Sequence, residues 1–387
     1  MDNGIIDEKE LIYFLETSKR VLLIEPPYRR SYVPLGLAKI SSFIKNKGGK
    51  VVYSRSFIPG DFDLICIATV FTNDADMVLK SIYECQDSLF SKGTKVIVGG
   101  VFASLMPEYI LKRSKKNLFI FPGYSKILDS YLPDYNLHYN IKGFFGKAMT
   151  LFTTRGCPNR CKYCMVWCME PKFHICPAWK KNIEEIDRKI CVISDNSFLS
   201  APFDHIKNVI ESLNKNGKKV IFNNGMNCRD INNENARLFA SLTYIRNGFR
   251  IGFDRMEDDG HYQKAMETLA KAGLKIKGNS YTYVIFNFED TPQEAYYRAR
   301  ECWKFGSNPY LMKYRPLNQV IKKPSYIGKY WTKNLVREFS NYGQNFGYNR
   351  GDQTFESWVN RRTEVLQKDI YKSKLTDEDW EKWYYRR

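Results

Sequence analysis

Short, continuous runs of apolar residues alternate with longer amphipathic stretches over the first third of the chain. Such runs predict buried parallel strands, here Arg20–Glu25, Lys50–Ser54, Asp63–Thr69, Lys95–Gly99 and Leu118–Phe121. Helices are predicted between them, notably over Leu37–Lys47, which stops at a glycine pair, and over Asp76–Leu89. Strand–helix alternation of this length predicts a doubly wound parallel sheet, whose ligands lie at the carboxyl ends of the strands.

The alternation starts again at Lys147. Six further strands are predicted, over Ala148–Thr154, Ile190–Asp195, Lys219–Asn224, Tyr244–Asp254, Ile276–Phe286 and Asn308–Tyr314. The helices between them are expected over Phe203–Asn216, Glu234–Leu242, Tyr262–Ala272 and Pro292–Phe305, with Thr291 as the N-cap of the last and proline at its first position. We therefore expect domains at 1–135 and 136–317, both of α/β class.

Residues 318–387 form a third segment, rich in Tyr, Trp, Lys, Arg and Asn, with helix-like stretches at Thr332–Tyr342 and Thr354–Gln367. Interleaved aromatic and basic residues can stack bases and neutralise phosphates. They can equally pack as a helical lid, and the charge excess of the segment is in proportion to that of the chain. The lid is the favoured interpretation of this C-terminal extension.

The composition, with 43% hydrophobic and 26% charged residues, is that of a soluble globular protein. No apolar run approaches the roughly 18 residues that a membrane span needs. The acidic N-terminus lacks the order of an export signal. Ten cysteines without such a signal indicate a reducing, cytoplasmic location.

The formal net charge of +18 would attract polyanions such as nucleic acid. A generally lysine-rich composition explains the same number without any ligand. Because no single basic block dominates, both interpretations of the net charge stay open: nucleic-acid binding and a generally lysine-rich composition.

Candidate chemistry is concentrated in Cys157, Cys161 and Cys164, a C-x3-C-x2-C triplet that directly follows a predicted strand. Thiolates so close in sequence can turn onto one soft metal centre, and iron–sulfur clusters favour such ligation. A [4Fe–4S] cluster held by three thiolates leaves one iron open to a small molecule. The alternatives are a zinc site, for which Cys168 would supply the fourth ligand, and ordinary thiols. Cys168 and Cys176 alone are too few for an auxiliary cluster.

The triplet, with the aromatic Tyr163 before its last cysteine, resembles the signature of radical S-adenosylmethionine (SAM) enzymes. The preceding R-G-C-P-N-R-C resembles the subgroup with an N-terminal cobalamin-binding-type domain. This resemblance implies a Rossmann-like N-terminal domain and a (β/α)6 partial TIM barrel. It also implies a [4Fe–4S] cluster whose open iron chelates SAM, and a flavodoxin or ferredoxin as electron donor. Reductive cleavage of SAM would give a 5′-deoxyadenosyl radical that attacks an unactivated carbon of a small-molecule, peptide or nucleic-acid substrate.

The first domain carries stretches similar to the cobalamin-binding type, such as V-G-G-V-F-A-S before Leu105. The D-x-H-x-x-G motif of that type is absent, so the domain either binds cobalamin or is a scaffold. Residues at the carboxyl ends of the strands are the candidate cobalamin contacts: Pro27, Tyr28, Thr72, Gly99, Gly100 and Ser104. For the glycine pair, a tight strand-to-helix turn is the simpler interpretation.

The candidate SAM contacts follow from the same resemblance and from the rule that strand ends carry barrel chemistry. They are Tyr163, Asp195, Asn196, Asn224, Arg229, Arg250 and Asp254. Asp195 and Asn196 lie in a stretch similar to the D-D-x-F element of the subgroup, although a turn or helix cap would also explain them. Arg229 could pair with the SAM carboxylate. His174 is a possible acid or base, with a surface histidine as the plainer alternative.

The expected reaction is methyl transfer if cobalamin is bound, and a radical rearrangement or a similar transformation if it is not. A nucleic-acid-modifying enzyme would use the same chemistry. A tRNA methylthiotransferase is disfavoured, because its N-terminal domain needs three further cluster cysteines and only Cys66 and Cys85 lie there. A non-enzymatic zinc-binding module is the remaining alternative. Cys66, Cys191 and Cys302 lie in apolar settings and are expected to be core thiols.

Overall fold

The computed structural model describes residues 3–29, 32–89, 93–320 and 326–346. The chain divides into two compact units, of which the first comprises Met1–Cys191 with Pro316–Pro324 and the second Val192–Arg315 with Ser325–Arg387. The division falls inside strand β10 (Ile190–Ile193).

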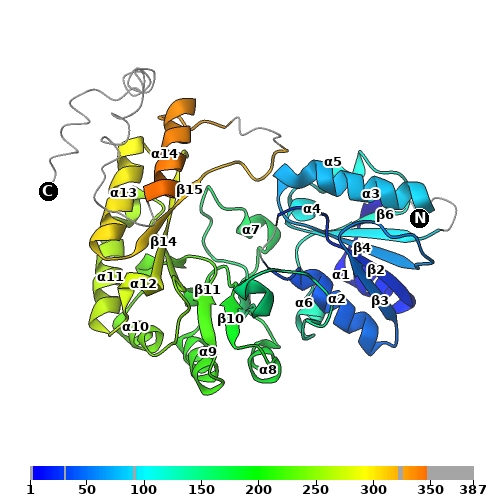
Figure 1. The fold of residues 1–387 in the computed structure, drawn as a ribbon, viewed down its shortest axis with the longest axis horizontal. Helices are drawn as coiled ribbons and strands as arrows, with labels where there is room; N and C mark the ends of the chain where they lie inside the picture. The colour runs from blue at the N-terminus through cyan, green and yellow to red at the C-terminus, as the bar shows by residue number, and fades with distance from the viewer. Residues whose placement is uncertain (1–2, 30–31, 90–92, 321–325, 347–387) are drawn as a thin grey trace. The chain divides into compact units, whose positions relative to one another are not determined.

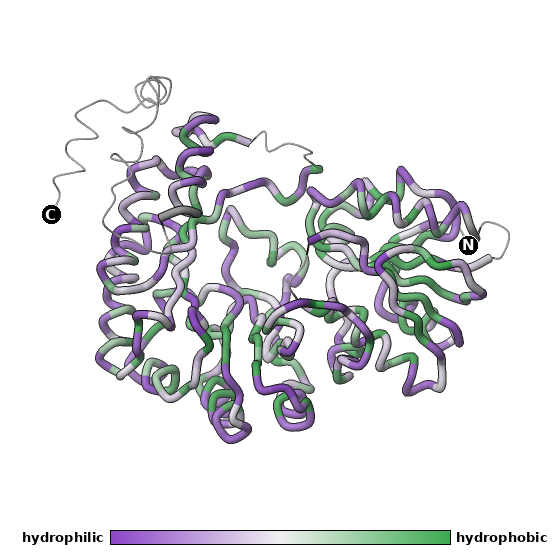
Figure 2. Tube along the Cα trace, viewed as in Figure 1, coloured by the Kyte–Doolittle hydropathy of each residue, from purple (hydrophilic) through white to green (hydrophobic). Residues whose placement is uncertain are grey.

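The first unit contains a six-stranded sheet with strand order β1-β6-β5-β4-β2-β3, and every neighbouring pair in it is parallel. The strands are β1 (Gly4–Ile5), β2 (Arg20–Ile24), β3 (Lys50–Ser54), β4 (Leu64–Thr69), β5 (Lys95–Gly100) and β6 (Leu118–Phe121). Hydrophobic residues run along its central strands (Figure 2). A strand covered on both faces needs apolar side chains at every position, which is why these strands are continuous apolar runs.

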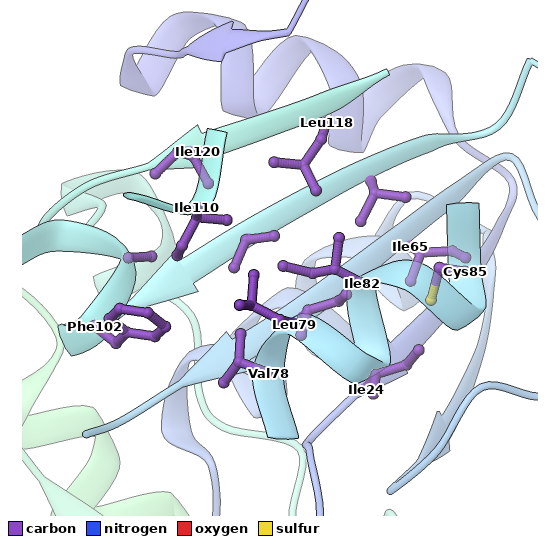
Figure 3. Close-up of a cluster of buried hydrophobic side chains, with 14 of the residues drawn as sticks. Ile24, Ile65, Val78, Leu79, Ile82, Cys85, Phe102, Ile110, Leu118 and Ile120 are labelled. Carbon is purple, nitrogen blue, oxygen red and sulfur yellow. The ribbon is translucent and has the colours of Figure 1, made fainter. Parts of the chain in front are cut away.

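Helices cover both faces of this sheet (Figure 1). Successive side chains of a strand point to opposite faces, and β2 shows the result: Leu22 and Ile24 belong to one core, Val21 and Leu23 to the other. The first core packs under α3 (Ala75–Leu89), α4 (Val101–Leu105) and α5 (Pro107–Leu111), and its Val78, Ile82 and Phe102 are visible in Figure 3. The second core packs under α1 (Glu8–Thr17), α2 (Leu35–Asn46) and α6 (Lys126–Asp129). The short η1 (Thr72–Asp74) belongs to the six-stranded part, between β4 and α3.

The remainder of the first unit holds a small hairpin. Strands β8 (Thr154–Arg155) and β9 (His174–Ile175) are antiparallel, with Thr154 opposite Ile175 and Arg155 opposite His174. The segment between them contains α7 (Val166–Met169), and along the chain the hairpin is preceded by η2 (Phe144–Lys147) and β7 (Ala148–Leu151) and followed by α8 (Trp179–Glu185). The hairpin therefore closes the base of a loop that carries the cysteine triplet.

The second unit contains a parallel sheet of order β12-β13-β14-β15, formed by Met226–Asn227, Phe249–Gly252, Ser280–Phe286 and Asn308–Lys313. Strand β11 (Lys219–Phe222) precedes it. Among its described residues, the unit has the helices α9 (Phe203–Lys215), α10 (Asn233–Ala240), α11 (His261–Lys271), α12 (Ile276–Asn279), α13 (Pro292–Lys304) and α14 (Lys333–Phe346). Its 3-10 turns there are η3 (Phe198–Ser200), η4 (Cys228–Asp230) and η5 (Met256–Asp258). Thr291 is the N-cap of α13 and proline follows it in the first turn, as predicted, and the structure adds a capping box with Glu294.

Two predicted strands of the second unit begin later than the apolar pattern indicated. Residues 276–279 form the short α12, because Gly278 takes a left-handed φ of +89°, and β14 starts only at Ser280. Strand β13 likewise starts at Phe249, after a turn in which Asn247 has a φ of +58°. Both strands start later than predicted for the same reason, because a residue with left-handed backbone conformation interrupts the extended chain before them.

The α/β class and the large parallel sheet are thus confirmed, whereas the partial barrel and the domain limits at 135 and 317 stay predictions. The predicted tail helix at Thr332–Tyr342 corresponds to α14, and the stretch Thr354–Gln367 lies outside the described residues. In the part of the chain that the structure describes, no helix is both long enough and apolar enough to cross a bilayer.

Candidate functional site

The cysteine triplet lies on the loop between β8 and α7. Cys157, Cys161 and Cys164 are partly exposed and Cys168 is exposed, and none of the four is in a disulfide. The backbone N–H of Cys164 donates to the Cys161 carbonyl at 3.0 Å, so that one tight turn holds these two residues with Tyr163 between them. A second backbone N–H, of Val166, donates to the Cys164 sulfur at 3.5 Å. Hydrogen bonds of this kind to a ligand sulfur tune iron–sulfur clusters.

The donor set of this loop fits an iron–sulfur cluster with three protein thiolates. The three cysteines form no disulfide, are partly exposed and are carried by one short loop. Among the described residues, no three His, Cys, Asp or Glu side chains are already gathered closely enough to hold a metal ion. The ligand assignment therefore stays a prediction that rests on spacing and donor type.

The expected core thiols are indeed buried. Cys66, Cys191 and Cys302 are each at most 2% exposed. Burial raises the pKa of the Cys66 and Cys302 thiols to about 12. Their burial agrees with the prediction that these are core thiols.

A buried ionic network lies at the base of the loop. Arg155 bonds the carboxylate of Asp129 and that of Glu170, and Glu170 also accepts a hydrogen bond from the Gly156 N–H. Burial alone would raise the pKa of the Asp129 carboxyl. The positive charges and hydrogen bonds of Arg155 and Lys39 lower it by more, so this pKa lies below its usual range. Sequence reasoning missed Asp129 and Glu170, because only the fold brings residues so far apart in the chain together.

His174, at the same base, is partly buried and has an aromatic partner. Its Nδ1 lies 3.2 Å from the Tyr124 hydroxyl, and the two rings are stacked with centroids 5.3 Å apart. Burial raises the pKa of Tyr124. Tyr124 follows β6 and was also missed; the position of an aromatic residue at a strand end was the available signal.

The candidate cobalamin contacts all lie at the carboxyl ends of strands of the six-stranded sheet. Pro27 is exposed after β2, Tyr28 is buried beside it, and Thr72 is buried in η1 after β4. The Tyr28 carbonyl accepts a hydrogen bond from Arg55, whose Nε is buried without a partner. The strand ends are therefore arranged as the sequence predicted, and the assignment to cobalamin stays a prediction.

Gly100 and Ser104 have structural roles that need no cofactor. Gly100 has a φ of +102°, and a Cβ there would lie 2.1 Å from the carbonyl oxygen of Thr69. The Ser104 hydroxyl donates to the Gly100 carbonyl and accepts from the Gly123 N–H, both at 2.7 Å. Gly99 lacks such crowding, since a Cβ there would meet only the Phe121 carbonyl at 3.6 Å. The prediction of a tight strand-to-helix turn at this glycine pair is confirmed.

Gly100→Ala is expected to destabilise the chain by roughly 3 kcal/mol or more, because left-handed strain and a backbone clash add together. The matched control is Gly48→Ala, since Gly48 has a similar φ of +77° and open space around it. The control should lose only about 1–2 kcal/mol. Urea unfolding of both variants measures the difference, and equal losses would contradict the close approach of Thr69 to Gly100.

In the second unit, three candidate SAM contacts come together. The Asn224 side-chain amide, after β11, donates to the Ser194 and Asp195 carbonyls at 3.0 and 3.2 Å and to Asn196 Oδ1 at 3.3 Å. Asp195 is 5% exposed and Asn196 is partly buried. The carboxyl ends of β10 and β11 are thereby joined into one polar group.

Arg250, on β13, supports the residue next to Asn224. Its Nη1 donates to the carbonyl and the side-chain oxygen of Asn223, both at 3.1 Å, and to the Tyr283 hydroxyl at 2.6 Å. Its guanidinium also lies 5.7 Å from the Tyr281 ring centroid. Arg250 thus acts on the polar group through Asn223, and the tyrosines were not predicted from the sequence.

The remaining two candidates have contacts of a structural kind. Arg229 Nε donates to Asp258 at 2.7 Å and its Nη2 to the Glu257 carbonyl at 2.6 Å. The Asp254 carboxylate accepts from the Ile285 N–H at 3.0 Å, which links the ends of β13 and β14. These contacts do not join Arg229 or Asp254 to the Asn224 group.

Comparisons with protein-family models and with curated proteins found no match for this chain.

Proposed function

We propose that the chain is a radical SAM enzyme in which Cys157, Cys161 and Cys164 hold a [4Fe–4S] cluster. The observation that carries the proposal is the C-x3-C-x2-C loop: three partly exposed thiols outside any disulfide, directly after a short strand, with a backbone N–H donated to the last sulfur. Three ligands leave one iron open, by the same logic that leaves a catalytic zinc its vacant position. When bound, such a cluster supplies the single electron that breaks the C5′–S bond of SAM and yields the 5′-deoxyadenosyl radical.

The part of the chain's own residues is to bind SAM and to orient it. In the second unit, the polar group of Asn224, Asp195 and Asn196 is the proposed contact for the ammonium end of SAM, because its oxygens can accept N–H bonds. Arg250 keeps Asn223, and with it this strand end, in place. A flavodoxin or ferredoxin is the proposed electron donor.

Methyl transfer with cobalamin at the carboxyl edge of the six-stranded sheet is the reaction outcome that we propose to test first. A radical rearrangement without cobalamin is the second candidate. It is favoured by the structural roles of Gly100 and Ser104 and by the missing D-x-H-x-x-G motif. The corrinoid absorbance of chain purified under anoxia with cobalamin supplied distinguishes the two.

The decisive experiment is anaerobic reconstitution of the full chain with iron and sulfide, followed by incubation with SAM and a strong reductant. We expect a brown protein with about four irons per chain and 5′-deoxyadenosine detectable by mass spectrometry. A colourless protein that binds one zinc ion and leaves SAM intact would overturn the proposal in favour of a zinc-binding module.

A further inference from the structure

The two ends of the cysteine loop meet at one guanidinium. Arg155 donates two parallel hydrogen bonds to the Asp129 carboxylate, from Nε at 2.9 Å and from Nη2 at 3.1 Å. Its third nitrogen, Nη1, donates to Glu170 Oε1 at 3.1 Å. Arg155 directly precedes the loop and Glu170 follows α7 at the other end, so a single side chain spans the opening.

The second oxygen of Glu170 closes the loop from the other side. Oε2 accepts the backbone N–H of Gly156 at 2.8 Å. One carboxylate therefore ties residue 170 to residues 155 and 156, and the three cysteines lie within the segment that it encloses. The side chains of Arg155 and Glu170 are only 11% and 12% exposed. Water screens such charge-assisted bonds poorly, which makes them strong.

The closure is anchored in the body of the first unit. Asp129 ends α6, and it also binds Lys39 of α2 at 2.5 Å, with both side chains less than 10% exposed. The Arg155 guanidinium lies 3.7 Å above the ring of Phe152. Gly156 has a φ of +77°, and a Cβ there would lie 2.5 Å from the Lys172 carbonyl. The chain therefore passes close to itself at the base of the loop.

We propose that Asp129, Arg155 and Glu170 are positioning residues that hold the cysteine loop closed before any metal arrives. A loop that is already closed has lost much of its conformational entropy on folding, so less remains to be lost when its thiols bind a metal. The closure itself depends only on the apo chain. Its use in retaining a metal rests on the function proposed above.

The closure is tested on the full apo chain by hydrogen exchange, with Glu170→Ala and the conservative Glu170→Gln. Loss of the carboxylate removes the acceptor of the Gly156 N–H, so we expect exchange in residues 156–169 to rise about tenfold or more in Glu170→Ala. Glu170→Gln keeps an acceptor oxygen, so its loop should exchange faster than that of wild type but more slowly than that of Glu170→Ala. The matched control is Glu185→Ala, an exposed carboxylate in an i,i+4 pair with Lys181. Unchanged exchange of the loop in Glu170→Ala overturns the proposal.

The use of the closure is tested by metal retention. After anaerobic reconstitution, iron is drawn off with a chelator, and Glu170→Ala should release it about tenfold faster than wild type or Glu185→Ala, because a loosened loop opens more often. Equal release rates, with exchange still accelerated, would overturn the role in metal retention but leave the closure. A wild-type chain that takes up no iron would overturn the proposed function, while hydrogen exchange still decides whether the loop is closed.

Discussion

Replacing Cys161 by alanine (Cys161→Ala) is expected to abolish SAM cleavage and to leave the reconstituted chain without an intact cluster. Two thiolates do not hold a [4Fe–4S] cluster with one open iron, and without it the electron for SAM has no carrier. The thiol is partly exposed, so its loss should change the free energy of unfolding by only about 0.5 kcal/mol or less. The iron content and 5′-deoxyadenosine formation of the variant check the first expectation, and urea unfolding of the apo chain the second.

Cys168→Ala is the matched control, because Cys168 is an exposed thiol on α7, directly after the triplet but outside it. It should keep both iron and activity. If Cys168→Ala loses its metal as completely as Cys161→Ala does, four thiolates close the site. The metal would then be held as a structural zinc is, and no position would remain for SAM.

The second large effect is expected at Arg298, a completely buried side chain of α13. Its Nη1 donates to the carbonyls of Phe253, Asp254 and Ile285 at 2.7–3.1 Å, and its Nη2 to Asp290 at 2.6 Å. Arg298→Met leaves a buried carboxylate and three carbonyls without this donor, so we expect a loss of roughly 3–5 kcal/mol. Urea unfolding measures it. The control Lys207→Met, which removes an exposed i,i+4 pair with Glu211, should cost about 0.5 kcal/mol or less.

The loss at Arg298 should also depend on pH. Burial raises the pKa of Asp290, and Arg298 opposes that rise; without Arg298 the pKa should be higher still. A carboxyl whose folded pKa exceeds its unfolded value holds its proton more tightly when folded, so stability falls as the pH rises between the two values. The deficit of Arg298→Met should thus widen from about pH 4 to about pH 7. A deficit that is constant over this range would show that the lost carbonyl contacts dominate, and not the charge that Asp290 keeps after losing its Arg298 partner.

The six-stranded sheet was the most predictable part of the fold. Its five longer strands coincide with the apolar runs to within a residue or two. Four of them, β2, β4, β5 and β6, are largely buried and therefore apolar, whereas the edge strand β3 is half-exposed. The first helix and strand were missed: β1 has only two residues, and α1 follows a polar, acidic start. The capping box of Asp7 and Glu10 was the signal that marked the start of α1.

The candidate site was predictable where its chemistry is local in sequence. The spacing of the triplet identified the loop, and the strand-end rule identified Asn224, Asp195 and Asn196, which the structure brings together. Nothing local marks Glu170 or Asp129 as the partners of Arg155, since contacts across 15 and 26 residues depend on the folded hairpin and on α6. Arg229 was a plausible anion ligand from its position, but the fold pairs it with Asp258.

The burial of most cysteines concentrates thiol chemistry in one place. Burial also raises the pKa of Cys85 and Cys228 to about 12, as it does for Cys66 and Cys302, so these sulfurs remain protonated and covered by side chains near neutrality. An oxidant or alkylating reagent in solution meets the loop thiols first, and above all the exposed Cys168. Handling in air would therefore damage the loop long before it damaged the core, and an inactive preparation could still be perfectly folded.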